Sequence, residues 1–252
     1  MSLLRAPRSP REPRASGLQR LDVAGEGDVR HEIVSGYMLA VFLGFVLAGF
    51  TALAAGPLVR IDTYFNLAPP PPEWRPVLQV VDRIGQRAVC LPILALVVLW
   101  CVRRTRSWRP MIVAGVSVFM LNLTVLILKI GLGRAAPATA DPYFFQGGLG
   151  AYPSGHTSNI VLVYGLMAYL ALRYGGVPRG RVWTLALAVT VLSVVMVGTS
   201  LTLNWHWFAD LVAGLLVGGL VLELTATIDL HLAASGPRRL RDAELVRRVA
   251  AT

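Results

Sequence analysis

Long apolar segments separated by short polar ones dominate the sequence from residue 33 onward. A helix needs about 20 apolar residues to cross a hydrocarbon core of about 30 Å. Six segments meet this requirement and predict transmembrane helices over residues 33–55, 79–102, 110–131, 155–174, 182–203 and 207–229. The second is the least regular, because its first turns, from Val77 to Arg87, are amphipathic and include Asp82. The expected fold class is therefore all-α, a polytopic bundle of six transmembrane helices.

The two ends of the chain differ from this apolar middle. Residues 1–31 are rich in Arg, Pro, Gly and Ser and contain few apolar side chains, so they bury too little surface to offset chain entropy. We expect a disordered basic arm over residues 1–31, a six-helix transmembrane domain over 32–230 and a basic tail over 231–252. The run Pro69 to Pro72 cannot be helical and predicts an extended connection before the second span.

The basic residues orient the predicted bundle, because cytoplasmic loops carry an excess of Lys and Arg. If both termini are cytoplasmic, 18 of the 24 basic residues lie on the cytoplasmic side. These are six in the arm, four in 103–109, three in 173–181 and five in 238–248. We predict a multi-pass protein of the plasma membrane with both termini in the cytoplasm.

Composition agrees with a membrane protein and excludes an ordinary soluble domain. The chain is 55% hydrophobic and 15% charged, with a mean hydropathy of +0.59, whereas soluble domains are about a quarter charged. The net charge of +10 would suit nucleic acid in a soluble protein. Here the arginines between apolar segments explain it, so we expect no nucleic-acid partner. Cys90 and Cys101 lie in one apolar segment and match neither a disulfide framework nor a zinc site. The Arg- and Ala-rich composition indicates a bacterial source.

Three polar clusters fall at the outer ends of the predicted spans, over residues 129–137, 152–157 and 204–210. Lys129 is the only lysine in the chain. Charged groups at membrane depth are costly, which favours a functional interpretation; the alternative is a side chain that extends to the interface.

These residue types suit a phosphate monoester, since phosphoryl transfer depends on positioning and on cations and N–H donors around the phosphate oxygens. Lys129 and Arg134 supply positive charge. The segment Pro153-Ser154-Gly155-His156 begins a predicted helix, whose free N–H groups favour an anion. Ser154 can cap this helix or donate to phosphate.

Two histidines complete the candidate chemistry. His206 and Asp210 are four residues apart, so on a helix they share one face. The carboxylate can then accept from one imidazole nitrogen and leave the other free to attack phosphorus. His156 is the natural proton donor to the leaving alkoxide.

Each feature alone has a simpler explanation: an interfacial histidine, a structural helix pair, or a turn with its cap. Their joint occurrence, in order and on one face, favours catalysis. Two histidines and an aspartate could also bind a metal, but Asp141 is the only other carboxylate in the two outer loops that carry them. We therefore expect no metal and no other cofactor.

In this order the clusters resemble the motifs of the type 2 phosphatidic acid phosphatase superfamily of membrane lipid phosphatases. Those motifs are Lys-x6-Arg-Pro, Pro-Ser-Gly-His and Ser-Arg-x5-His-x3-Asp, and the similarity spans about residues 110–225. The resemblance implies that His206 is a nucleophile forming a phosphohistidine and that Asp210 supports it. It implies His156 as general acid. The implied phosphate ligands are Lys129, Ser154 and Gly155.

The sequence departs from the family pattern at two arginine positions. Ala136 stands where the first motif has arginine, and Thr199-Ser200 stands where the third has Ser-Arg. A hydrogen bond to a charged group is worth about 1.5–3 kcal/mol, so two unreplaced losses could abolish turnover. We predict that Arg134 replaces the arginine missing at Ala136.

The expected function is metal-independent hydrolysis of a phosphoric ester in a membrane lipid, with the active site facing outside. Candidate substrates are phosphatidic acid, phosphatidylglycerol phosphate and polyprenyl phosphates. Two alternatives stay open: a lipid phosphotransferase, and a non-hydrolytic protein that binds or transports lipid phosphates. The sequence specifies neither the lipid chain nor an oligomeric state.

Overall fold

The computed structural model of the protein describes residues 17–137 and 141–235, and every regular element in these ranges is helical. Six helices are long and apolar enough to cross a membrane. They cover Gly27–Ala54, Arg87–Thr105, Arg109–Leu132, Gly155–Arg173, Arg179–Thr202 and Phe208–Ala234. The expected all-α fold with six spans is confirmed.

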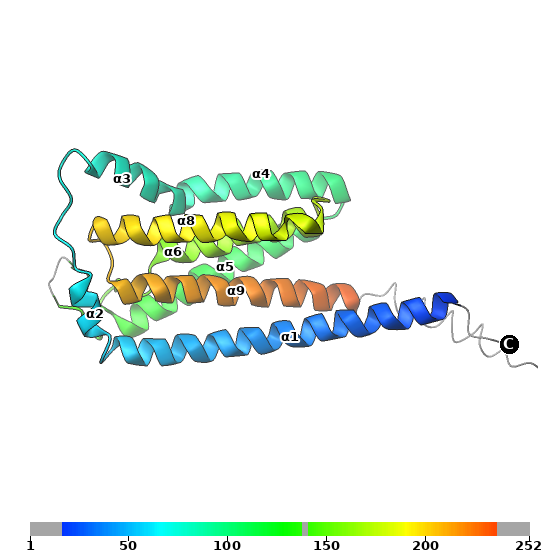
Figure 1. Ribbon diagram of the computed structural model, residues 1–252, viewed down its shortest axis with the longest axis horizontal. Helices are drawn as coiled ribbons and strands as arrows, with labels where there is room; N and C mark the ends of the chain where they lie inside the picture. Colours follow the sequence, from blue (N-terminus) through cyan, green and yellow to red (C-terminus); the bar gives the residue numbers. More distant parts are fainter. Residues whose placement is uncertain (1–16, 138–140, 236–252) are drawn as a thin grey trace, which may run out of the picture.

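The spans alternate in direction along one long bundle (Figure 1). They are α1 (Gly17–Ala54), α4 (Arg87–Thr105), α5 (Arg109–Leu132), α8 (Val182–Thr202) and α9 (Phe208–Ala234), with a fourth span in three parts. That span consists of α6 (Gly155–Asn159), the π-helical turn η3 (Ile160–Tyr164) and α7 (Gly165–Arg173). Helix α9 packs against α1, α5, α8 and the fourth span, whereas α4 packs on α5 and α7. The start of α1 and the end of α9 therefore lie at the same end of the bundle (Figure 1).

The opposite end carries the short elements α2 (Val59–Tyr64), α3 (Arg75–Asp82) and the 3-10 turn η1 (Arg83–Gly85). We call it the polar end, because the buried carboxylates Asp62, Asp82 and Asp210 lie there. Between the two ends the outer surface is apolar, with Phe45 of α1 75% exposed and Val194 of α8 67% exposed. Such a surface suits contact with lipid chains.

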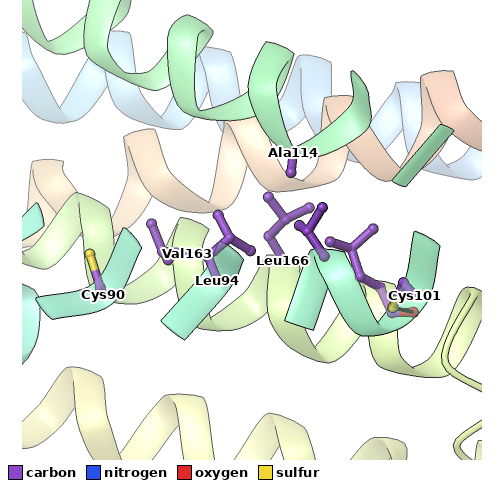
Figure 2. Close-up of a cluster of buried hydrophobic side chains, with 8 residues drawn as sticks. Cys90, Leu94, Cys101, Ala114, Val163 and Leu166 are labelled. Atoms are coloured by element: carbon purple, nitrogen blue, oxygen red, sulfur yellow. Dashed lines mark hydrogen bonds between the residues drawn. The ribbon is translucent and has the colours of Figure 1, made fainter. Parts of the chain in front are cut away.

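An apolar cluster joins α4, α5 and α7 (Figure 2). Leu94 of α4, Ala114 of α5 and Leu166 of α7 belong to it. Cys90 and Cys101 are buried in the same cluster as free thiols, in agreement with the sequence interpretation.

Small residues bring α9 into close contact with the fourth span. A Cβ atom at Gly214 would overlap the Thr157 hydroxyl, and one at Gly218 would lie 2.7 Å from the Ser158 carbonyl oxygen. The two glycines are four residues apart, the spacing that lets membrane helices approach backbone to backbone. This approach sets the start of α9 against the start of α6.

Three element boundaries differ from the sequence predictions. Helix α1 begins at Gly17, inside the segment expected to be disordered. The second span begins at Arg87, because Gln86 adopts an extended conformation (ψ 139°) and separates α4 from η1 and α3. Helix α9 continues to Ala234, into the predicted tail. The predictions for the rest of the arm and tail fall on residues 1–16 and 236–252, outside the described residues.

Candidate active site

The structure gathers the three predicted clusters at the polar end. They lie on the end of α5, the start of α6 and the loop between α8 and α9. The side chain of His156 is 28% exposed and that of His206 is 14% exposed. The two histidines are near enough to interact electrostatically. Both candidate catalytic histidines therefore belong to one site.

The His206–Asp210 pair forms, but not on one helical face as predicted. His206 precedes α9, which begins at Phe208 with Trp207 as its N-cap. Asp210 Oδ2 accepts from the Trp207 backbone N–H (3.0 Å) and lies 3.4 Å from His206 Nδ1. The carboxylate thus reaches back across the helix start, as in a capping interaction. The contact leaves His206 Nε2 available for chemistry.

Arg134 connects this pair to the first loop of the chain. Its Nη1 donates to Asp210 Oδ1 (2.7 Å), and its Nη2 pairs with Asp62 of α2. Asp62 Oδ1 in turn accepts from the backbone N–H of Ala209 (2.8 Å). Burial raises the pKa of Asp62, and the Ala209 N–H and the Arg134 charge oppose that rise. Asp62 was not identified from the sequence, where nothing links it to a motif.

Arg134 is consequently not placed as a phosphate ligand that replaces the arginine missing at Ala136. Its side chain is 0% exposed and also donates from Nε to the Pro142 carbonyl (3.1 Å). Gly133, with φ +46°, ends α5 in the left-handed conformation that glycine adopts most readily. The chain turns there, and Arg134 enters the protein interior.

Lys129 lies at the end of α5, half-buried beside the loop that precedes α6. Its Nζ donates to the carbonyl oxygens of Gly150 (2.8 Å) and Ala151 (3.2 Å). An ammonium has three N–H donors, so one remains for a further acceptor. The close fit of this loop requires Gly150, since a Cβ there would overlap the backbone nitrogen of Arg134.

Ser154 is the N-cap of α6, and Gly155 is its first residue. The Ser154 backbone N–H donates to the carbonyl oxygen of Asp210 (2.9 Å), which joins the second motif to the third. The Ser154 hydroxyl is buried, without a hydrogen-bond partner among the described residues. Buried hydroxyls normally have a partner, so this group is available to a ligand.

His156 has an acidic neighbour that the sequence did not identify as such. Its Nε2 lies 3.4 Å from Oδ2 of Asp82, the last residue of α3 and fully buried. Burial raises the pKa of Asp82, whereas the charges of His156 and His206 oppose the rise. In the sequence Asp82 belonged to an amphipathic helix start, and no motif spacing connects it to His156.

No group of three or more His, Cys, Asp or Glu side chains that could hold a metal ion occurs in residues 27–137 and 141–235, whose side chains the structure describes. Metal independence stays a prediction.

Comparison with known proteins gives two similarities. The family model of the PAP2 superfamily matches residues 110–231. The crystal structure of the first transmembrane PAP2 type phosphatidylglycerolphosphate phosphatase from Bacillus subtilis aligns with a TM-score of 0.58 and 19% sequence identity. The alignment covers 79% of this chain and 96% of that one, so the two share a fold. No curated protein sequence matches the chain.

Proposed function

Because residues 110–231 belong to the PAP2 superfamily, we propose that this membrane protein hydrolyses a lipid mono- or diphosphate. The observation that carries the proposal is the pairing of each histidine with its own buried aspartate: His206 with Asp210 and His156 with Asp82. One histidine can act as nucleophile while the other transfers protons.

In the first step His206 Nε2 attacks the phosphorus atom. A P–N bond forms, the P–O bond to the lipid breaks, and His156 donates a proton to the departing alkoxide oxygen. Asp210 holds Nδ1 of His206, which orients the ring and stabilises the positive charge that develops on it. The product of this step is a phosphohistidine.

In the second step a water molecule attacks the same phosphorus atom. His156, now neutral, accepts a proton from the water, the P–N bond breaks, and inorganic phosphate leaves. Asp82 favours the protonated form of His156 that begins each cycle, since a carboxylate stabilises an adjacent imidazolium.

The charge of the phosphoryl group is held by side chains and backbone donors. Lys129 supplies a positive charge and its remaining N–H. The Ser154 hydroxyl and the backbone N–H of Gly155 supply neutral donors at the start of the fourth span. This donor set requires no divalent metal in the mechanism.

The distribution of charge supports an extracytoplasmic site at the plasma membrane. Arg103 and Arg104 end α4, and Arg179 and Arg181 precede α8, so all four lie at the end opposite to the active site. The positive-inside rule assigns that end to the cytoplasm.

The test is release of inorganic phosphate by purified protein from a panel of phosphatidic acid, phosphatidylglycerol phosphate, and polyprenyl mono- and diphosphate. We expect release from at least one lipid by the wild type and by His231→Ala, and none by His206→Ala. His231 is a matched control, because it lies at the other end of α9, where its Nδ1 is 3.2 Å from the Tyr37 hydroxyl.

Two other outcomes would replace the proposal. Phosphate release that falls when an acceptor alcohol is added, with phosphorylated alcohol appearing, identifies a phosphotransferase. Saturable binding of the lipids without release from any of them identifies a binding or transport protein.

A further inference from the structure

The polar end contains more negative than positive charge among the residues already assigned to the site. Asp62, Asp82 and Asp210 are buried there, whereas the cations assigned so far are Arg134 and Lys129. Arg134 is bound to two of the carboxylates. A lipid phosphate monoester brings up to two further negative charges. If Lys129 alone bound it, repulsion between the phosphate and the buried carboxylates would weaken binding.

The two positions at which the family motifs have arginine supply no charge. Ala136 is apolar and Ser200 is a fully buried hydroxyl on α8. A second phosphate-binding cation, in addition to Lys129, therefore has to come from outside the three motifs, and the segment that joins α3 to α4 contains one.

This segment, residues 82–87, is packed against His156. Asp82 contacts His156 Nε2 as described, and the Gly85 carbonyl accepts from Asn159 Nδ2 (3.0 Å). A Cβ atom at Gly85 would lie 3.1 Å from both the Cβ and the carbonyl oxygen of His156. The backbone two residues before Arg87 is thus packed so closely against the candidate general acid that a side chain at Gly85 would crowd it.

Arg87 is the first residue of α4, which starts at the polar end (Figure 1) directly after the segment that includes η1, and η1 packs against α6. Its side chain is exposed and has no hydrogen bond or ion pair with any residue in the described ranges. It is near enough to His156 and Lys129 to act on both electrostatically. The guanidinium is therefore charged, unpaired and close to two residues of the site.

We propose that Arg87 binds the non-bridging oxygens of the substrate's phosphoryl group and so replaces an arginine that the motifs lack. The proposal rests on the phosphate site described above. A guanidinium presents paired N–H donors that match two phosphate oxygens. Because Arg87 has no carboxylate partner among the described residues, binding phosphate breaks no existing ion pair.

A different role for an exposed arginine at a helix end is contact with lipid headgroups in general. Arg83 of η1 provides the control, since it is exposed, lies four residues earlier in the same connection, and makes no side-chain hydrogen bond or ion pair with a catalytic residue within the part of the chain that the structure describes. General headgroup contact predicts similar effects of Arg83→Gln and Arg87→Gln, confined to membrane substrates.

The experiment uses the full-length purified protein and inorganic phosphate as the probe, titrated calorimetrically. We expect Arg87→Gln to weaken phosphate binding about tenfold or more, the loss typical of a charge-assisted hydrogen bond. Arg87→Lys should recover part of the affinity, and Arg83→Gln should change it less than about twofold. KM for a water-soluble short-chain lipid phosphate should rise in parallel.

The outcomes separate this inference from the proposed hydrolysis. If the wild type hydrolyses lipid phosphates and Arg87→Gln binds phosphate with unchanged affinity, the role of Arg87 is overturned and the proposed hydrolysis is not. Phosphate binding that depends on Arg87 in a protein without turnover supports the role and overturns hydrolysis. The role of Arg87 is also overturned if the wild type does not bind phosphate, or if the Arg83 and Arg87 substitutions have equal effects.

Discussion

Arg134 illustrates how the role of a residue depends on neighbours that are distant in the sequence. Arg134 lies two residues before Ala136, where the family motif has arginine, so the motif alone suggests it as the substitute. Its partner Asp62 is 72 residues away on α2, and this contact makes Arg134 a positioning residue for Asp210. The two carboxylates hold the guanidinium in the protein interior, where its side chain is fully buried.

Arg134→Gln should therefore destabilise the protein. Removing one partner from a buried ion pair leaves an uncompensated charge and typically costs about 3–5 kcal/mol. Thermal unfolding in detergent should show a marked decrease in Tm. The control is Arg60→Gln, since Arg60 is exposed on the same short helix as Asp62. An Arg134→Gln protein with unchanged Tm and a raised KM would restore the phosphate-ligand role.

Asp82→Asn separates stability from activity. Burial raises the pKa of Asp82 above its ordinary value, so the ionised carboxylate that the proposed mechanism uses at neutral pH costs stability in the folded state. The stability contributed by this group is thus present at low pH and is lost as pH rises through the folded-state pKa. At neutral pH the asparagine variant should be at least as stable as the wild type, and the difference in Tm should shrink as pH falls.

The same Asp82→Asn substitution should slow hydrolysis, because His156 loses the group that favours its protonated form. The loss should be greater for lipids, whose alkoxide must be protonated, than for an activated aryl phosphate. His156→Ala should show the same dependence on the leaving group with a larger effect, about 10²- to 10⁴-fold. Equal losses on both substrates in either variant would contradict the general-acid role.

At the scale of elements, the six spans were predictable because apolar length alone identifies a membrane helix. The start of the second span was not, since the break at Gln86 accompanies the packing of Gly85 against His156, a tertiary contact. The sequence also placed the His206–Asp210 pair on one helix, whereas α9 begins only at Phe208 and His206 precedes it. Residue spacing predicts that two side chains can meet, but not which local geometry brings them together.

The close contact of α9 with the fourth span leads to a prediction at this scale. Gly218→Ala should lower both Tm and activity, because the added methyl would lie 2.7 Å from the Ser158 carbonyl oxygen and 2.9 Å from Val161 Cβ. Moving α9 outward would also separate Asp210 from Ser154. Gly219→Ala on the same helix is the control, since no atom lies within 4 Å of its added Cβ. Equal behaviour of the two variants would contradict this packing.

At the scale of the whole molecule, the predicted orientation places the active site outside. A single cysteine at Gln146, which is exposed and whose backbone N–H donates to the Gly133 carbonyl after α5, should react with a membrane-impermeant maleimide in intact cells. A cysteine at Arg179, exposed at the other end, should react only after permeabilisation. Cys90 and Cys101 are replaced by alanine in this background. The reverse labelling pattern would place the site in the cytoplasm.

The central claim is that His206 carries the phosphoryl group between the lipid and water. The most direct measurement is mass spectrometry of the peptide containing His206 after mixing with substrate and rapid alkaline quenching, which preserves phosphohistidine. We predict phosphate on His206 in the wild type, none in His206→Ala, and a slower but detectable signal in Asp210→Asn, because the aspartate orients the ring without forming the bond. Turnover without a phosphorylated His206, or full activity of His206→Ala, would contradict the account.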